Sequence, residues 1–445
     1  MQKVLVLGAG RSASTLIHFM LEHAESNDWY VTIGDIDQTL AVIKVGAHKN
    51  ARGIKFDIKS RDSINIIKGH DLVISMLPAL LHLDVARVCA ESGINMLTAS
   101  YVTSEIRALS TSFEKNNACL IMEMGLDPGI DHMSAMQILD RIRNEGNTLN
   151  SFETFTGGLL APSNNDNPWE YKFTWNPRNV VVAGQGNVKF IQEGTYKYIP
   201  YQKLFKRTEI IYIPDYGHFE GYANRDSLKY LEAYKLQGIK TLYRGTLRRP
   251  GFCKAWDVFV QLGATDDSYE MEDVAAMTHR QFINSFLSYN PYDSVELKLA
   301  HYMNLELDSE IMYKLKWLGV FSDELVGLKK GTPAQILEKI LKKKWTIQSD
   351  EQDMIVMWHK FKFVRDHEER EIQSHMVIKG TDAINTAMSK TVGLPLAVTA
   401  KLILTGKLKV KGVKIPTEKE IYEPVLAALK AYGITFVEQE IEVSV

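Results

Sequence analysis

Short runs of β-branched and aliphatic residues alternate with helical spacing of apolar residues over about the first 125 positions. Such alternation is typical of a parallel sheet whose strands are joined by right-handed crossover helices. The predicted strands are 3–7, 30–33, 54–57, 72–75, 95–98 and 119–122. The predicted helices are 14–23, 39–45, 60–67, 82–92 and 104–117. The pattern therefore predicts an α/β fold that begins with a Rossmann-type, doubly wound parallel sheet.

The pattern changes near residue 151, where longer aromatic and β-branched runs begin. Runs at 152–155, 179–182, 208–213, 240–247, 353–363 and 370–378 predict a mixed sheet. Helical spacing at 272–286, 294–303, 309–318 and 332–343 predicts a helical insert. The last of these helices opens with Thr332 as N-cap and Pro333 in the first turn. A final helix at 381–404 contains Pro395, which must kink it or divide it.

These patterns predict three parts of the chain. The first is the Rossmann-type domain at 1–125, and the second is a mixed α+β domain at 126–265 and 346–384. The third is the helical insert at 266–345. For the C-terminal segment, about 385–445, the sequence leaves open whether it packs back onto the first domain.

Charge and cysteine content exclude several classes of function. Lysine and arginine number 52 against 54 aspartates and glutamates, so the net charge of −2 predicts no nucleic-acid or membrane partner. The 3 cysteines are far apart, which predicts neither a disulfide framework nor a metal site. The first residues lead straight into an apolar strand, and charge interrupts every apolar run before about 20 residues. We therefore expect a cytoplasmic protein.

A glycine pattern of the form G-x-G-x-x-A lies between the first predicted strand and helix. Its residues are Gly8, Ala9, Gly10, Arg11, Ser12 and Ala13. Gly8 permits a tight turn, Gly10 lets the backbone approach a pyrophosphate, and Ala13 allows close packing of helix on strand. The helix N-terminus then binds phosphate. The pattern predicts a dinucleotide site, with a purely structural turn as the alternative.

The second strand ends at Asp35, followed by Ile36. A carboxylate here accepts hydrogen bonds from ribose hydroxyls and repels a 2′-phosphate, so NAD is predicted over NADP. Asp37 fits equally well as the cap of the next helix, and Arg11 either reaches a phosphate or stays solvated. Further cofactor contacts are expected after the third and fourth strands, with plain turns as the alternative, at Asp57, Ile58, Leu77 and Pro78.

Polar segments also follow the fifth and sixth strands: T-A-S-Y at 98–101 and E-M-G-L-D-P-G-I-D-H at 123–132. Ligands of open α/β sheets bind outside these carboxyl ends. Two glycines and a proline make the second segment a rigid turn with a polar rim. Asp131 either caps the following helix or faces a ligand, and His132 is interpreted as a structural donor.

The chain here resembles the saccharopine reductase family, the glutamate-forming saccharopine dehydrogenases. The resemblance rests on 125–132, on A-S-Y at 99–101, and on co-linear motifs at 157–158, 161–162, 166–168, 171–175, 224–226, 244–248, 317–319 and 392–395. It implies reversible, nicotinamide-dependent oxidation of saccharopine, through an imine, to glutamate and 2-aminoadipate 6-semialdehyde in lysine metabolism. Fungal members have arginine where this chain has Asp35, which puts their NADP preference in doubt here.

The resemblance also implies which residues contact the ligands. Substrate contacts map to Ser100, Tyr101, Asp127, Arg225, Gly245, Thr246 and Leu247. Cofactor contacts map to Ala99, Ser100, Leu126, Asp127, Pro128 and Asn176.

Residue chemistry agrees with this mapping, because a substrate with three carboxylates and two amines needs guanidinium groups and a carboxylate. Arg225 is the first choice for a substrate carboxylate, and the weaker candidates are Arg244, Arg178 and Lys172. The catalytic candidates are Asp127, as partner of the substrate ammonium, and Tyr101, as proton donor; a turn-forming role and a packed aromatic are the alternatives.

Two other functions compete with this interpretation. A related reductive-amination enzyme, such as carboxynorspermidine dehydrogenase, would act on a diamine, whereas Arg225 and Arg244 favour a polycarboxylate. A nucleotide-binding sensor without turnover is the more remote alternative. A homodimer is expected for a dehydrogenase of this size. The direction of the reaction in the cell is left open by the sequence.

Overall fold

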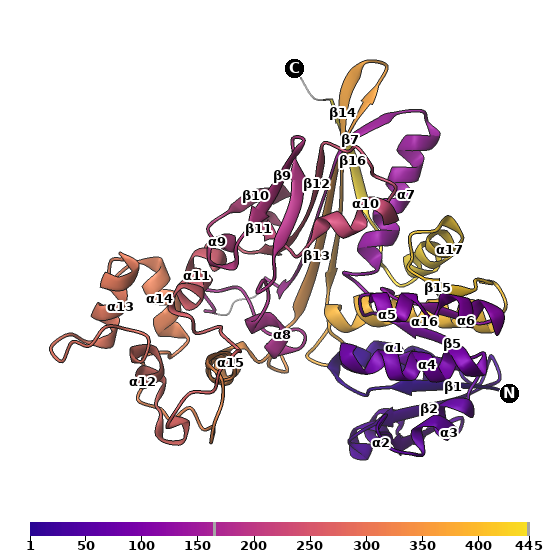
Figure 1. Cartoon of the computed structure of the whole chain (residues 1–445), viewed down its shortest axis with the longest axis horizontal. Coiled ribbons are helices and arrows are strands. Elements are labelled where there is room, and N and C mark those ends of the chain that lie inside the picture. The colour runs from indigo at the N-terminus through magenta and orange to yellow at the C-terminus, as the bar shows by residue number, and fades with distance from the viewer. Residues whose placement is uncertain (163–165, 443–445) are drawn as a thin grey trace. The chain divides into compact units, whose positions relative to one another are not determined.

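The computed structural model describes residues 1–162 and 166–442. The chain divides into two compact units (Figure 1). The first unit comprises Met1–Leu149 and Met376–Val437, and the second comprises Asn150–His375 and the chain from Glu438 onward.

The first unit is built on a seven-stranded sheet of order β15-β6-β5-β4-β1-β2-β3. Its strands are β1 (Gln2–Leu7), β2 (Trp29–Asp35), β3 (Ala51–Lys55), β4 (Leu72–Ser75), β5 (Asn95–Thr98), β6 (Cys119–Ile121) and β15 (Gly412–Lys414). Neighbouring strands in this order pair in parallel. The predicted Rossmann-type class is thereby confirmed. The third strand begins at Ala51 instead of residue 54, because its ladder with β2 runs from Ala51 to Lys55 and ends before the apolar Phe56.

Helices connect these strands as expected for crossover connections. They are η1 (Arg11–Ala13), α1 (Ser14–Glu22), α2 (Gln38–Val45), α3 (Ser63–Lys68), η2 (Ala79–Leu81), α4 (His82–Ser92), α5 (Ser104–Arg107), α6 (Ser110–Lys115), α7 (Ile130–Asn144), α16 (Ala387–Leu404) and α17 (Lys419–Lys430). The single helix predicted at 104–117 is in fact two, α5 and α6. Helix α4 matches its prediction, and it ends where Gly93 adopts a left-handed φ of 67°.

Helix α16 packs closely on α1 within the first unit. A Cβ atom on Gly393 would lie 2.8 Å from the backbone nitrogen of Leu16, and the amide of Thr15 donates to the Ser389 hydroxyl over 2.9 Å. The helix runs through Pro395 as one element, so the predicted division does not occur. Among the described residues it is the one helix long and apolar enough to cross a membrane, yet 67% of that window is buried inside the structure. Its packing accounts for its apolar character.

The boundaries of the first unit differ from those predicted. Helix α7 packs against α17, so the unit extends to Leu149 instead of ending at residue 125. The segment 376–437 belongs to this unit as well, and its β15 pairs with β6 at the sheet edge. Local pattern carries no information on such packing between distant segments.

The second unit contains a nine-stranded sheet, of which seven strands follow the order β10-β11-β12-β7-β13-β14-β16. Its strands are β7 (Thr148–Leu160), β8 (Val188–Gln192), β9 (Thr195–Ile199), β10 (Thr208–Ile213), β11 (Gly217–Ala223), β12 (Thr241–Arg248), β13 (Asp353–Arg365), β14 (Glu368–Lys379) and β16 (Val437–Glu442). Strand β12 runs parallel to β7 and antiparallel to β11. The predicted mixed sheet is confirmed.

Several helices of the second unit depart from prediction. The helices of this unit are α8 (Pro177–Val181), α9 (Tyr201–Leu204), η3 (Ser227–Lys229), α10 (Tyr230–Ala233), α11 (Phe252–Leu262), η4 (Val274–Ala276), α12 (His279–Asn284), α13 (Val295–Met303), α14 (Glu310–Trp317) and α15 (Pro333–Trp345). Of these, α9, α10 and α11 were not predicted. The strand predicted at 179–182 is wrong: α8 forms there because Asn176 caps it and Pro177 occupies the first turn. The helix predicted at 272–286 is reduced to η4 and α12, since Asp273 adopts a left-handed φ of 52°. Residues 266–345, predicted as a separate insert, fall within this unit.

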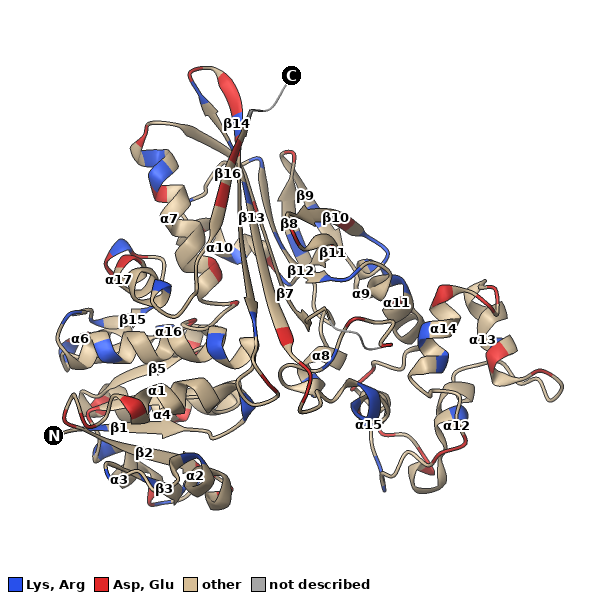
Figure 2. Ribbon diagram, turned by 180° about the vertical axis from the view of Figure 1, so that it is seen from behind, with Lys and Arg blue, Asp and Glu red and all other residues tan. Residues whose placement is uncertain are grey.

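The lysine-rich last turn of α15 is blue in Figure 2. Lys342 pairs with Glu338 at 2.5 Å, Lys343 pairs with Glu324, and the Lys344 ammonium lies 5.1 Å from the centre of the Trp317 ring. This run is therefore a neutralised helix end.

Candidate nucleotide and substrate sites

The glycine loop joins β1 to η1 at the carboxyl edge of the first sheet. Gly8 has a φ of 99°, and a Cβ atom there would lie 2.9 Å from the carbonyl oxygen of Met76, so the position requires glycine. Gly10 is exposed, and a Cβ there would have no neighbour within 4 Å. The buried Ala13 lies where the chain enters α1. This arrangement leaves room for a phosphate group beside the backbone of Gly10.

Asp35 holds the glycine loop. Its Oδ2 accepts the backbone N–H of Ala9 over 2.7 Å, and its Oδ1 accepts the N–H of Asp37 over 2.9 Å. Asp37 in turn caps α2 by accepting the N–H of Thr39 over 2.9 Å. Two amide dipoles therefore offset the charge of the Asp35 carboxylate, which weakens its repulsion of a 2′-phosphate.

The remaining predicted cofactor residues of the first unit differ in how exposed their side chains are. Ile36 is 70% exposed, and Arg11 and Pro78 are exposed as well. Ile58 and Leu77 are half-buried against the sheet core. Asp57 accepts the N–H of Lys59 over 3.0 Å in a local turn, and Ser12 is half-buried in η1.

Ser100 follows β5, and a buried histidine that the sequence reasoning missed holds it. Nε2 of His82 lies 2.7 Å from the Ser100 hydroxyl and 3.3 Å from the Thr98 hydroxyl, while Nδ1 lies 2.9 Å from the Ser75 hydroxyl. Burial lowers the pKa of His82 to about 4, so the ring is neutral near pH 7. The signal available in the sequence was that Ser75 ends one strand and Ser100 closely follows the neighbouring strand.

Tyr101 and Asp127 come together at this edge. The Tyr101 hydroxyl donates to Oδ1 of Asp127 over 3.3 Å, although 26 residues separate them along the chain. Both side chains are half-buried, as is the neighbouring Ala99. A phenol and a carboxylate in this arrangement can pass a proton between them and present a negative charge to an ammonium group.

The turn from Gly125 to Gly129 places Asp127. A Cβ on Gly129, whose φ is 149°, would lie 2.1 Å from the carbonyl oxygen of Gly125. The N–H of Gly125 donates to the carbonyl of Pro128 over 2.9 Å, and the Asp127–Pro128 peptide is cis. Leu126 and Pro128 are buried. The backbone therefore presents Asp127 on a compact, closed loop.

Buried ionisable groups lie behind this turn. Glu123 accepts from Nε2 of His132 over 2.7 Å and from the N–H of Val102 over 3.0 Å. Asp131 accepts the N–H of Gly129 over 2.6 Å from the first turn of α7, and is not its N-cap. Burial by itself would raise the pKa of Glu123, but the hydrogen bond and charge of His132, together with the Val102 amide, hold it below its usual range. This cluster ties the turn to the segment that carries Tyr101.

In the second unit, the predicted substrate residues on β12 lie in the interior of the mixed sheet. Gly245 faces the Phe155 ring, where a Cβ would lie 2.1 Å from the nearest ring carbon. Leu247 is buried, and the half-buried Thr246 pairs with Tyr222 across β11. These residues form the wall of a packed sheet.

The arginine candidates differ sharply in their surroundings. Arg225 is exposed on a backbone with a left-handed φ of 53°. Arg244 is buried, with its guanidinium carbon 4.3 Å from the centre of the Tyr230 ring. Arg178 pairs with Asp267, and Lys172 pairs with Glu351. Two of the three weaker candidates are therefore held in ion pairs of the second unit.

Asn176 has a local role in the second unit. Its side chain accepts the N–H groups of Arg178 and Asn179 at the start of α8. Asp127 belongs to the first unit and Arg225 to the second. That both contact one substrate, as the family resemblance implies, stays a prediction.

Comparison with known proteins covers nearly the whole chain. Residues 4–121 match the family model of the saccharopine dehydrogenase NADP binding domain, and residues 125–434 match that of the saccharopine dehydrogenase C-terminal domain. The mitochondrial α-aminoadipic semialdehyde synthase of Rattus norvegicus is 34% identical over 98% of this chain, which spans 47% of that protein. The chain thus spans about half the length of these relatives.

Fungal relatives match from end to end. The saccharopine dehydrogenase [NADP(+), L-glutamate-forming] of Schizosaccharomyces pombe is 28% identical, over 99% of this chain and 100% of that protein. The solved apo saccharopine dehydrogenase (L-Glu forming) of Saccharomyces cerevisiae superposes with a TM-score of 0.89 and 27% identity, covering 99% of this chain and 100% of that one.

These findings overturn the predicted preference for NAD. The matching N-terminal model is an NADP binding domain, and the fungal relatives are named for NADP(+). The prediction failed because it treated Asp35 as a free carboxylate, whereas the fold uses it to fasten the glycine loop. With two family models covering residues 4–121 and 125–434 and a matching structure over its length, the chain belongs to the saccharopine dehydrogenase family.

Proposed function

We propose that this chain is an NADP-dependent, glutamate-forming saccharopine dehydrogenase of lysine metabolism. In the oxidative direction, saccharopine, NADP⁺ and water give glutamate, 2-aminoadipate 6-semialdehyde, NADPH and a proton. The C–H bond beside the secondary amine breaks, its hydride leaves, and the resulting imine takes up water and splits into amine and aldehyde.

The end-to-end structural match to the L-Glu forming enzyme of Saccharomyces cerevisiae, with a TM-score of 0.89, is the observation that carries this proposal. The full-length match to the Schizosaccharomyces pombe enzyme supports it. A relative that matches this chain over its own full length is stronger support for a shared reaction than a relative twice as long, of which this chain matches only half.

The glycine loop fits the nucleotide. The open space beside Gly10 suits a pyrophosphate, and the start of η1 and α1 directs backbone N–H groups toward it. Arg11 is exposed, with no ion pair within the described chain, and is our candidate for the 2′-phosphate. The bound nicotinamide supplies hydride acceptance. Arg11→Ala should raise the Kd for NADP more than that for NAD.

Residues of the first unit supply the proton chemistry. Asp127 carries the charge that attracts the substrate ammonium, and the Tyr101 hydroxyl stabilises that carboxylate by donating to it. Neutral His82 orients the Ser100 hydroxyl, which the family resemblance assigns to both ligands. Imine hydrolysis needs only short proton transfers, and this set supplies them.

Incubation of the purified protein with saccharopine and NADP, with both absorbance of the reduced nicotinamide and released glutamate recorded, tests the proposal. Reduction with a one-to-one yield of glutamate is expected. Turnover of carboxynorspermidine but not saccharopine would select the diamine alternative. Nucleotide binding without any turnover would select the sensor.

Substitution of the exposed arginine tests the substrate class. Arg225→Ala should lower kcat/KM for saccharopine roughly 30- to 1000-fold. This corresponds to a loss of about 2 to 4 kcal/mol of transition-state stabilisation, because a charged hydrogen bond to a carboxylate is removed. Lys229→Ala is the matched control, because this exposed lysine lies four residues away in the same segment. Equal efficiency of the Arg225 variant and the control would remove Arg225 from the site.

The homodimer and the cytoplasmic location inferred from the sequence stay predictions. Sedimentation of the purified chain tests the first, and imaging of the tagged chain in its host tests the second.

A further inference from the structure

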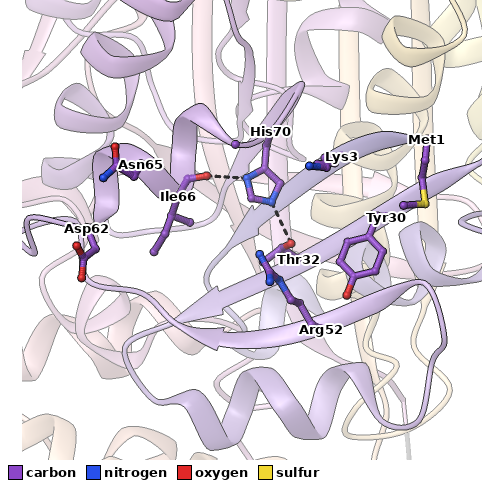
Figure 3. A pocket seen from close by; sticks show the side chains of 10 residues that line it. Met1, Lys3, Tyr30, Thr32, Arg52, Asp62, Asn65, Ile66 and His70 are labelled. Atoms are coloured by element: carbon purple, nitrogen blue, oxygen red, sulfur yellow. Dashed lines mark hydrogen bonds between the residues drawn. The ribbon is translucent and has the colours of Figure 1, made fainter.

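A cavity lies in the first unit, away from the glycine loop. It has a volume of about 610 Å³ and is lined by side chains from β1, β2, β3 and the end of α3 (Figure 3). The residues that matter are Lys3, Tyr30, Thr32, Arg52 and His70. Its volume lies in the range of small-molecule pockets, about 300 to 1,000 Å³.

Strand register places the lining side chains on one face of the sheet. Lys3 pairs with Tyr30, and Thr32 pairs with Arg52. Partners across a ladder point to the same face, and residues two apart along a strand do so as well, so all four side chains project together. Figure 3 shows them, with His70, around one space.

This cavity lies at the amino edge of the strands, whereas ligands of such sheets bind at the carboxyl edge. Lys3 precedes Gly8 by five residues along β1, which corresponds to about 16 Å of extended strand. The cavity is therefore distinct from the nucleotide site that the glycine loop forms.

Two cationic side chains and one acidic side chain line the cavity. Within the described chain, neither the Lys3 ammonium nor the Arg52 guanidinium has an ion-pair or hydrogen-bond partner. The Asp71 carboxylate accepts the backbone N–H of Lys3 over 2.7 Å, and Asp62 is the one acid among the lining residues. Burial lowers the pKa of His70 most, Arg52 and Lys3 lower it further, and the Ile66 carbonyl and the Asp71 carboxylate raise it.

His70 lies at the base of the cavity as a neutral ring, and both of its nitrogens have hydrogen-bond partners. Nδ1 lies 2.7 Å from the carbonyl oxygen of Ile66, which only accepts, so this nitrogen carries the proton. Nε2 then accepts from the Thr32 hydroxyl over 2.9 Å. His70 thus fixes the end of α3 against β2 and leaves ligand binding to the two cations and the Tyr30 hydroxyl.

We propose that this cavity binds a small organic anion with a phosphate or carboxylate head group, held between Lys3 and Arg52 beside Tyr30. The strands β1 and β3 flank β2, so the Cα atoms of the two cationic residues lie about 12 Å apart by sheet geometry. Side chains of this length converge on one phosphate or reach both ends of a short dicarboxylate. The proposal is independent of the dehydrogenase reaction.

Calorimetric titration of the full chain with inorganic phosphate, and separately with glutarate, tests this site. NADP is left out, because its own phosphates would compete for the proposed site, and the site variant reports any binding of the probes at the glycine loop. The site variant is Lys3→Ala with Arg52→Gln. The control variant is Arg61→Gln with Lys68→Ala, which removes the same charge from exposed positions that do not line the cavity.

At least one probe should bind the wild-type chain and the control equally, and bind the site variant at least tenfold more weakly. Binding of phosphate alone identifies a phosphate head group, and binding of glutarate alone a carboxylate. Absence of binding to the wild type, or equal binding to all three chains, would overturn the proposal. Saccharopine turnover by the site variant should match wild type, so failure here is separable from failure of the proposed reaction.

Discussion

The neutral state of His82 makes a quantitative prediction about stability and pH. Its pKa falls from 6.5 to about 4 on folding because burial disfavours the charged ring. The unfolded chain therefore binds a proton at higher pH than the folded chain. The stabilisation from this site is complete above pH 6.5 and is lost as pH falls toward 4.

The magnitude follows from these two pKa values. At pH 5 the linkage relation gives a loss of about 2 kcal/mol relative to pH 8. His82→Gln removes the titrating group together with bonds to Ser75 and Ser100. We expect the variant to be about 1 to 3 kcal/mol less stable at pH 8. That gap should shrink by about 2 kcal/mol at pH 5.

Urea unfolding at pH 8 and pH 5 measures this change. Trp29 is the one tryptophan of the first unit, so its ¹⁹F signal in protein labelled with 5-fluorotryptophan reports that unit alone. His18→Gln is the matched control, because the His18 side chain is 80% exposed and this variant should follow wild type at both pH values. If His82→Gln and wild type lose stability in parallel, the argument from burial is wrong.

Three further predictions concern packing and buried charge. Gly129→Ala should abolish saccharopine turnover, because its Cβ would lie 2.1 Å from a carbonyl oxygen, whereas Gly186→Ala should retain turnover, because a Cβ there would have no neighbour within 4 Å and the position has no left-handed φ. Glu123→Gln should lower the free energy of unfolding of the first unit by about 1.5 to 3 kcal/mol at pH 7, with a smaller loss in acid. Glu351→Leu should destabilise the second unit by about 3 to 5 kcal/mol, because it leaves the buried Lys172 ammonium without its partner. Adding Lys172→Met should restore most of the lost stability. Urea titrations measure the stability of the Glu123 and Glu351 variants.

Local patterns determined the class of the fold. The alternation of strands and helices predicted β4, β5 and α4 to the residue, since a strand buried on both faces is a continuous apolar run and a helix buried on one face repeats every 3.6 residues. Short-range capping was equally legible, as with Thr332 and Pro333 at α15. Where capping was overlooked, as at Asn176, a β-branched run was mistaken for a strand.

Motifs indicated candidate sites, but not the hydrogen-bond partners of their residues. The glycine loop and the turn around Asp127 are sequence-local, because steric limits on glycine act between residues close in the chain. The sequence singled out Asp35 as a reason to prefer NAD. It did not show that Asp35 accepts a hydrogen bond from Ala9, 26 residues away. His82 was overlooked, because its partners are hydroxyl groups at the ends of two other elements, and the sequence marks only the serines.

The sequence alone thus determined the sheet class, the nucleotide loop and the family resemblance, all of which depend on spacing along the chain. Tertiary structure decided that His82 is neutral and that Asp35 holds the glycine loop. It also decided that 376–437 belongs to the first unit and that a cavity with two cationic side chains lies at the amino edge of its sheet. Each of these depends on burial or on contact between segments far apart in sequence. Periodicity shows that a face is buried, but only the folded chain shows what lies against it.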